Sequence, residues 1–324
     1  MPGGFNVNTR RKIIQLADIQ YPAGGGIVYT NLPKVGLLAR IWLAVRGTVG
    51  GTVNAANALG YSSAINRFRL TANSSIDVYN VSGVGNSYLV SNTLESEYFN
   101  IQGQNQGTSA VVVGNFNLDT LIPCMINMRD PIGLLMLQNE QTVVTLVSDF
   151  NTPTNVGGST ATITALTVTP YLEVFTVPVS PQDWPPLNVV HQILEDTVPV
   201  AGSGDQTYYW PRGNTYLQVL HGAGLGVAGA DGFSKVQWRV NQSDNIISDS
   251  KGNVYQDLEY RGLRGRARPL GGIFFDLMGT SGLGCYGLQR DLFNSALVTD
   301  VETVITYTGG TTQYNERRQL VVLQ

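Results

Sequence analysis

His191 and His221 are the only histidines in the chain, so they are the first residues to test for metal chemistry. A metal site of the cupin type needs several histidines and a carboxylate that converge inside a β-barrel. Neither histidine belongs to a His-x-His pair, and the two lie in different parts of the sequence. We therefore interpret both as structural histidines and expect no metal and no cofactor.

Nucleophilic catalysis is the next chemistry that the residue types suggest. Ser, His and Asp are all present, but the Gly-x-Ser-x-Gly motif of α/β-hydrolases is absent. Cys124 lies in the apolar segment LIPCMIN, which is typical of a buried and unreactive thiol, whereas the segment GLGCYG around Cys285 is less informative. The glycine-rich segments end in neither GKS nor GKT and do not match a phosphate-binding loop.

Two pairs of carboxylates have the composition of a glycosidase site: Glu95 with Glu97, and Asp257 with Glu259. Two carboxylates that flank a sugar act there as acid and base or nucleophile. Both pairs lie in segments that we expect to be helical, and side chains two positions apart on a helix point in different directions. We interpret them as solvated helix faces and predict that the chain is not an enzyme.

A run of arginines is the densest charge in the chain: Arg261, Arg264, Arg266 and Arg268. Such a run can contact nucleic acid, anionic lipid or an acidic protein surface. The corresponding stretch in the first half of the chain, residues 91–93, reads Ser-Asn-Thr and carries no charge. The fold therefore does not need the arginines. A solvated loop is the simplest interpretation, and an intersubunit contact is the functional one that we prefer.

Basic and apolar residues alternate near the N-terminus. Arg10, Arg11 and Lys12 precede Ile13 and Ile14, and Thr9 is placed to cap a short helix. A helix of this kind is typical of segments that bind a surface such as a membrane. We predict that these three cations face a membrane or another surface of this kind. A terminal helix packed on its own domain is the alternative.

The elements that would position these residues occur twice. The segment Phe68-Arg69-Leu70 is followed by a polar turn and a short strand, and the segment Trp238-Arg239-Val240 is followed by the same pattern about 170 residues later. Further segments match in the same order in the two halves. VGLLARIWLAV in the first half matches GNTYLQVL in the second, and VVVGNFNLD matches PLGGIFFDL. TVVTLVSDF likewise matches VETVITY, and YLEVFTV matches RRQLVVL. A repeat of this length is a whole domain.

The sequence between these matching segments is rich in residues that favour β-strands. Runs of Val, Ile, Thr and Tyr are separated by Gly, Asn, Ser and Asp, which is typical of a sandwich or barrel. We predict an all-β fold of two tandem eight-stranded jelly rolls with a few short helices. The helices are expected at residues 87–99, 130–141, 254–265 and 287–296, and in the segment LNVVHQILEDT. The expected divisions are an N-terminal arm (1–26), a first jelly roll (27–178), a proline-rich linker (179–206) and a second jelly roll (207–324).

The composition of the chain limits the kinds of partner that it can bind. Only 13% of the 324 residues are charged, against about 25% in typical proteins. The cations are 16 Arg and 4 Lys, a bias found at protein interfaces, although a codon preference is the alternative explanation. The net charge of −3 argues against a protein that condenses nucleic acid by itself. Two cysteines are too few for a disulfide framework, and we expect neither a signal peptide nor a transmembrane span.

The duplication, the prolines of the linker and the basic arm together resemble the double jelly-roll major capsid proteins of tailless icosahedral, tectivirus-like viruses. This resemblance implies a homotrimer whose six barrels approximate a hexagon and tile an icosahedral shell. It also implies minor capsid and vertex proteins as partners, an arm on the inner face near an internal membrane, no sequence-specific binding of nucleic acid, and location in the virion after assembly in the host cytoplasm.

Two other classes of protein stay open. A secreted glycan-binding or glycan-processing protein made of two β-sandwiches is the first, although no disulfide pattern supports it. A tail or spike protein of a phage is the second, although such proteins often show fibre-like repeats. Glycan binding or amidase turnover would favour the first of these classes.

Overall fold

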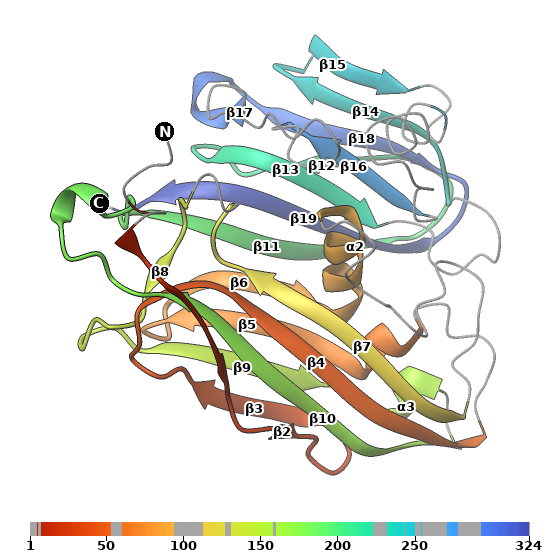
Figure 1. Cartoon of the computed structure of the whole chain (residues 1–324). Helices are drawn as coiled ribbons and strands as arrows, with labels where there is room; N and C mark the ends of the chain where they lie inside the picture. Colours follow the sequence, from red (N-terminus) through yellow and green to blue (C-terminus); the bar gives the residue numbers. More distant parts are fainter. Residues whose placement is uncertain are drawn as a thin grey trace.

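The structure is a computed structural model of the whole chain, shown in Figure 1. It describes residues 5, 8–52, 60–93, 113–126, 131–157, 160–222, 232–242, 244–249, 254, 271–277 and 293–323.

Strands dominate the first half of the chain. They are β1 (Arg11–Gln15), β2 (Ile19–Gln20), β3 (Gly26–Asn31), β4 (Leu37–Thr52), β5 (Ile65–Ala72), β6 (Ile76–Ser82), β7 (Gly114–Pro123), β8 (Leu135–Met136), β9 (Val144–Phe150) and β10 (Thr160–Phe175). Three short helices accompany them, and they are η1 (Gly60–Ala64), α2 (Gly83–Thr93) and α3 (Pro153–Gly157).

The second half repeats this plan. Its strands are β11 (Val189–Val200), β12 (Gly204–Tyr209), β13 (Thr215–Gly222), β14 (Phe233–Val240), β15 (Asp244–Asp249), β16 (Gly272–Asp276), β17 (Phe293–Asn294), β18 (Val301–Tyr307) and β19 (Thr311–Val322). Two 3-10 helices, η3 (Pro181–Asp183) and η5 (Ser295–Leu297), lie before β11 and after β17.

The strands form three sheets whose orders reveal the duplication. A six-stranded sheet has the order β1-β10-β4-β7, and its two further strands, β2 and β8, pair with β10 and β4. A nine-stranded sheet has the order β16-β13-β19-β11-β6-β5-β9-β3, and its ninth strand, β17, pairs with β13. A four-stranded sheet has the order β12-β18-β14-β15. The run β3-β9-β5-β6 therefore matches β12-β18-β14-β15. The run β1-β10-β4-β7 likewise matches β11-β19-β13-β16. Each half of the chain thus supplies two facing sheets, as the predicted jelly rolls require.

The match extends to an irregularity in the register. In β10 and β4, Glu173 pairs with Arg40 and the next residue, Val174, pairs with Leu38, so one residue of β4 is skipped. In β19 and β13, Arg318 pairs with Gln218 and Gln319 with Tyr216, which skips one residue of β13 in the same place. A β-bulge is a specific feature of a sheet. Its presence at one site in both halves fixes which residues correspond.

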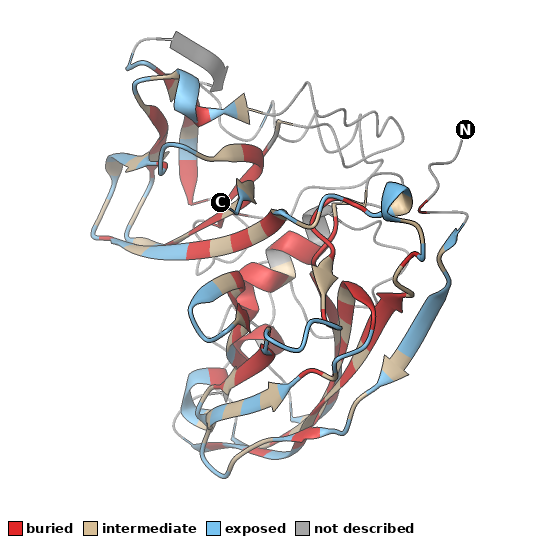
Figure 2. Ribbon diagram, turned by 90° about the vertical axis from the view of Figure 1, so that its left-hand side faces the viewer, coloured by how far each residue is buried: buried red, intermediate tan, exposed pale blue. Residues whose placement is uncertain are grey.

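Each barrel has its own apolar core, as the buried residues in Figure 2 show. β4 alternates buried and half-buried residues, because successive side chains on a strand point to opposite faces. Phe68 and Trp238, which open the repeated segments, are 1% and 0% exposed and lie in the two separate clusters. Burying one such side chain stabilises the fold by about 1.5–3 kcal/mol.

The two barrels share a seam. Strand β6 of the first barrel lies parallel to β11 of the second, with Tyr79 opposite Ile193 and Asn80 opposite Leu194. This contact joins four strands from each barrel, together with β17, into the nine-stranded sheet, which Figure 1 shows running through the molecule. Because strands of both barrels belong to one hydrogen-bonded sheet, the barrels are held at a fixed angle.

Several predicted helices are wrong. Residues 11–15 form β1, which pairs along its length with β10. The segment LNVVHQILEDT belongs largely to β11, because its backbone groups find partners on β19 and β6. Residues 131–141 contain turns and β8 instead of a helix. The strand-free part of the expected linker therefore ends at residue 188.

One predicted helix is confirmed in part, and two lie largely outside the described residues. Helix α2 begins at Gly83, four residues earlier than expected, and is described to Thr93. The segments 254–265 and 287–296 fall mostly outside the described part of the chain, in which residues 293–297 form β17 and η5. No described helix is long and apolar enough to span a membrane.

Candidate functional site

The two histidines are buried and serve the fold. His191 lies on β11, where its Nδ1 lies 3.2 Å from the Cys124 carbonyl oxygen and its Nε2 accepts a hydrogen bond from Nε of Arg318 at 3.2 Å. His221 on β13 bonds to Asn315. Burial lowers the pKa of His221 to about 4, and burial followed by the charge of Arg318 lowers the pKa of His191 well below its usual value. Both imidazoles are therefore neutral at pH 7.

The thiol of Cys124 is also buried, as predicted, and burial raises its pKa. A protonated thiol without access to solvent is a poor nucleophile. Within the described ranges, no three or more His, Cys, Asp and Glu side chains are grouped so that they could hold a metal ion.

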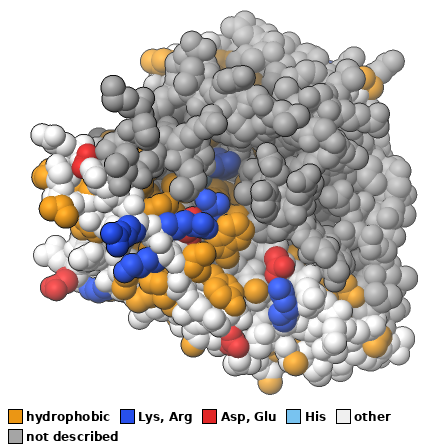
Figure 3. Space-filling view, in the orientation of Figure 1, with side chains coloured by type: hydrophobic (Ala, Val, Ile, Leu, Met, Phe, Trp, Pro, Cys, Tyr) orange, Lys and Arg blue, Asp and Glu red, His pale blue; other side chains and the backbone are white. Residues whose placement is uncertain are grey.

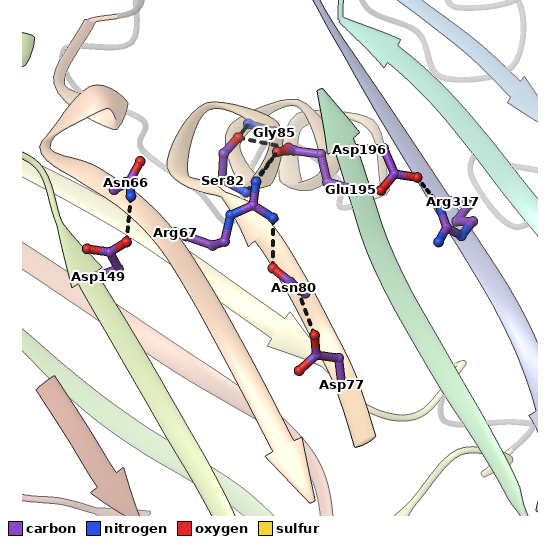
Figure 4. Close-up of polar contacts among 10 residues, drawn as sticks. All are labelled: Asn66, Arg67, Asp77, Asn80, Ser82, Gly85, Asp149, Glu195, Asp196 and Arg317. Atoms are coloured by element: carbon purple, nitrogen blue, oxygen red, sulfur yellow. Dashed lines mark hydrogen bonds and ion pairs between the residues drawn. The ribbon is translucent and has the colours of Figure 1, made fainter. Parts of the chain in front are cut away.

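A network of polar side chains crosses the seam (Figure 4). Glu195 on β11 accepts hydrogen bonds from the hydroxyl of Ser82 at 2.8 Å and from the backbone N–H of Ser82 at 3.2 Å. Arg67 on β5 approaches the same carboxylate at 3.3 Å and donates to Asn80 at 2.7 Å. The Glu195 side chain is 0% exposed, and the groups that bond to it belong to the first barrel. Burial raises the pKa of its carboxyl even so.

The first turn of helix α2 closes over this network. The backbone N–H of Gly85 donates to the Ser82 hydroxyl at 2.9 Å. A methyl group at Gly85 would overlap the carboxylates of both Glu195 and Glu316. Glycine is therefore the residue that lets two strands of the second barrel approach a helix of the first.

Glu316 is the second buried carboxyl of the seam. It lies on β19 directly opposite Glu195 on β11. Neither of its carboxyl oxygens has a hydrogen-bond partner among the described residues. Burial, and then the nearby Glu195, raise the pKa of Glu316 well above its usual value. Because two ionised carboxylates repel each other at close range, we infer that Glu316 is protonated at pH 7.

Further bonds tie the seam along its length. Gln192 on β11 donates to the backbone carbonyl of Asp77 on β6 at 2.9 Å, and Gln319 donates to Gln192 at 3.0 Å. Farther from β6, Asp196 on β11 forms an ion pair with Arg317 on β19. A buried polar network adds little net stability, but each member penalises any other alignment of the strands. The polar network of the seam is therefore suited to holding the two barrels in one alignment.

The N-terminal cations lie at the other edge of the first barrel. Arg10, Arg11 and Lys12 are all exposed, and Arg11 and Lys12 belong to β1. Figure 3 shows Lys and Arg side chains gathered beside apolar side chains over this part of the molecule. The surface of β1 therefore combines positive charge with apolar groups, although it is a strand and not the predicted helix.

One of these cations has a partner inside the chain. Arg11 forms a bidentate pair with Glu173, with distances of 2.8 and 3.1 Å. Arg40 approaches the same carboxylate at 3.2 Å, and the indole N–H of Trp42 donates to it at 3.0 Å. The Glu173 side chain is 1% exposed, whereas that of Arg11 is 52% exposed. Arg11 therefore anchors β1 to β10 and still presents part of its guanidinium to solvent.

Several predicted site residues fall outside the described residues. They are Glu95, Glu97, Asp257, Glu259, Arg261, Arg264, Arg266, Arg268 and Cys285. The interpretation of the arginine run as an intersubunit contact stays a prediction.

Sequence reasoning missed the residues of the seam. Glu195 lies in a segment expected to be a linker, and the glycines at 83 and 85 were expected to form a loop. One signal was available: residues 191–195, HQILE, resemble residues 11–15, RKIIQ, in the order of polar and apolar positions. That match marks β11 as the counterpart of β1.

Comparison with known proteins establishes the fold. No family model matches the chain, and no curated protein matches it by sequence. The structure is similar to that of the major capsid protein of Sulfolobus turreted icosahedral virus, with a TM-score of 0.71, 14% identity and 97% of each chain covered. It is also similar to VP54 of PBCV-1, with a TM-score of 0.66, 11% identity and coverage of 98% of this chain and 95% of that one.

A third similar structure is the major capsid protein P2 of bacteriophage PM2, with a TM-score of 0.55 and 12% identity. The match covers 97% of this chain and 98% of that one. These likenesses extend over both barrels and the connection between them. The chain is therefore a double jelly roll, as the sequence predicted.

Proposed function

We propose that this protein is the major capsid protein of an icosahedral virus and that it forms homotrimeric capsomers with a nearly hexagonal outline. The observation that carries the proposal is the whole-chain match to the major capsid protein of Sulfolobus turreted icosahedral virus, which covers 97% of both chains at 14% identity. The match includes both barrels and their placement relative to each other, although few residues of the two proteins are identical.

The seam supports a structural role. It contains buried carboxylates, but Glu195 is fully engaged by Ser82 and Arg67, and Glu316 is 2% exposed. A general acid or nucleophile must reach a substrate. Neither carboxyl reaches solvent, so the network is better suited to holding the barrels rigidly than to catalysis.

The proposal extends to location and partners. The protein would reside in the virion after assembly in the host cytoplasm, beside minor capsid and vertex proteins. The exposed cations at 10–12 support an inner face toward an internal membrane, since basic residues attract anionic lipid. Sequence-specific binding of nucleic acid is not part of the proposal.

Light scattering coupled to size exclusion tests the oligomer on purified full-length protein. We expect a mass three times that of the 35.0 kDa chain. A strict monomer at high concentration in several buffers would count against the capsid role. Binding to a glycan array, or amidase turnover, by that monomer would favour a glycan-binding or glycan-processing protein.

A further inference from the structure

The backbone contact that joins the two barrels is short. Within the described structure, β6 and β11 face each other in two residue pairs, Tyr79 with Ile193 and Asn80 with Leu194. β11 pairs with β19, by contrast, along all 12 of its residues. Because a single hydrogen bond adds little net stability, the side chains at the seam decide whether it stays closed.

Two carboxyl groups of the second barrel meet beside this short contact. Glu195 on β11 and Glu316 on β19 lie opposite each other in the register of the two strands. One carboxyl oxygen of each lies less than 3.0 Å from the position that a Cβ atom would take at Gly85 on helix α2. Both residues are buried. The two oxygens therefore approach the same buried point above a helix of the first barrel.

The contact lacks a hydrogen-bond donor when both groups are ionised. Glu195 accepts hydrogen bonds from Ser82 and faces Arg67, but neither oxygen of Glu316 has a partner among the described residues. An ionised carboxylate can only accept a hydrogen bond, whereas a protonated carboxyl can also donate one. Burial, and then Glu195, raise the pKa of Glu316 well above its usual value. Glu316 is therefore the group that holds a proton, and Glu195 is an acceptor directly opposite.

The groups around the pair offer little to replace that proton. The charged and titratable side chains around it in the described part of the chain are Arg67 on β5, Tyr79 on β6, Asp196 on β11, and Tyr314 and Arg318 on β19. Arg67 bonds to Glu195, whereas Arg318 donates to His191 and Gln218. Helix α2 and β13 contribute the apolar side chains of Val84 and Leu220. Ionisation of Glu316 would thus place a second negative charge beside one bonded arginine.

We propose that Glu195 and Glu316 share one proton, and that this proton acts as a pH-sensitive latch that holds β11 against β6. While the proton is present, the Glu316 hydroxyl donates to a Glu195 oxygen. When hydroxide removes it, two carboxylates repel each other at close range in a buried site, and separation of β11 from β6 lets water reach them. Val190 and Ile193, which pack on the core of the first barrel, oppose that separation.

The direction of the pH effect follows from these charges. In the closed seam, Glu316 keeps its proton to a higher pH than in an open seam, where water solvates the carboxylate. A rise of pH therefore favours the open seam, and a fall of pH favours the closed one. The latch lies within one chain and does not depend on assembly, so its failure would leave the proposed function standing.

The first test measures the distance between the barrels in the full-length protein. Spin labels are attached to Thr154→Cys in the first barrel and Thr308→Cys in the second, both exposed positions, in a Cys285→Ser background. Labelled chains are diluted with unlabelled protein, so that the measured distance lies within one chain. We expect one narrow distance near about pH 7 and a longer, broader distribution near about pH 9, where a buried carboxyl ionises. Glu316→Gln should keep the narrow distance at both pH values.

Glu302→Gln is the matched control for this test. Glu302 is also buried and pairs with Arg239, but it lies on β18, in the four-stranded sheet that takes no part in the seam. Its substitution should leave the pH response as in the wild type. A wild type that keeps its narrow distance near about pH 9 would refute the latch, and so would a Glu316→Gln protein that opens as the wild type does.

Hydrogen exchange, corrected for the intrinsic effect of pH on its rate, separates seam opening from unfolding. Protection of residues 77–82 and 189–197 should fall near about pH 9, while protection of β9 and β18 is kept. Equal loss in all of these strands would mean that the whole fold melts, which contradicts a latch at the seam. A seam that stays closed at this pH in calcium and opens on chelation would assign the carboxyl pair to a bound cation and overturn the shared proton.

Discussion

At the scale of single residues, Glu316 is a carboxyl group that the fold shields from water. It is 2% exposed, and neither carboxyl oxygen has a hydrogen-bond partner among the described residues. Burial and Glu195 raise its pKa. As pH rises past the ordinary carboxyl range, the unfolded chain releases a proton that the folded chain keeps, so the folded state loses relative stability.

We therefore expect Glu316→Gln to stabilise the protein, with a gain that is small near about pH 5 and larger near about pH 8, because glutamine is neutral in both states. Urea unfolding at a series of pH values measures this difference. Glu140→Gln, which changes an exposed side chain, serves as the control and should leave the curve unchanged. An equal gain for Glu316→Gln at every pH would show that ionisation is not the cause.

Gly85 permits a second prediction at this scale. A methyl group there would overlap Glu195 and Glu316, so Gly85→Ala should destabilise the fold by about 1–3 kcal/mol, as overpacking of a filled interior does. Gly202→Ala is the matched control, since nothing lies within 4 Å of the added carbon. Thermal unfolding of both variants tests the difference. Equal melting temperatures would mean that the helix can move away from the seam without cost.

Residue roles were predictable only where the local sequence decides them. Cys124 was expected to be buried because its neighbours are apolar, and the structure confirms it. Glu195 and Glu316 were not predicted to meet, because their pairing depends on two strands that are distant in sequence.

At the scale of elements, β1 shows how a side-chain pair positions a strand. Glu173 receives Arg11, Arg40 and the Trp42 indole while nearly excluded from solvent. Removal of the shared acceptor separates both cations from their partner. We expect Glu173→Ala to cost about 1.5–3 kcal/mol, the range for hydrogen bonds to charged groups.

Hydrogen exchange should locate that effect, with faster exchange at residues 11–15 than in the wild type. Asp119→Ala provides the contrast, since the Arg46–Asp119 pair has side chains 42% and 40% exposed. A surface pair of this kind contributes about 0–1 kcal/mol. If both variants lost the same stability, or if β1 stayed protected in Glu173→Ala, the anchoring role of Glu173 would be refuted.

The wrongly predicted helices show that the spacing of apolar residues alone does not decide between a helix and a strand. In β11, the apolar residues Val189, Val190, Ile193 and Leu194 have the spacing of a helix face. The segment is nevertheless a strand, since β19 pairs with it along its whole length and β6 pairs with its middle. Tertiary pairing of this kind overrides local preference. The repeated strands β5 and β14 were recognised because their neighbours along the chain repeat as well.

At the scale of the whole molecule, duplication explains the architecture. The order of matching segments predicted two jelly rolls, and the strand orders of the three sheets confirm them. The parallel contact of β6 with β11 could not be predicted, because the sequence of neither strand indicates which other strand will lie beside its edge. That contact sets the angle between the two barrels of the chain.

The most direct test of the proposed function is the shape of the particle that purified full-length protein forms. Native mass spectrometry combined with two-dimensional classes from electron microscopy would measure it. We predict particles of three chains with a nearly hexagonal outline, made of six barrels around one axis. Monomers at every concentration, or particles without threefold symmetry, would contradict the proposal that this double jelly roll builds a capsid.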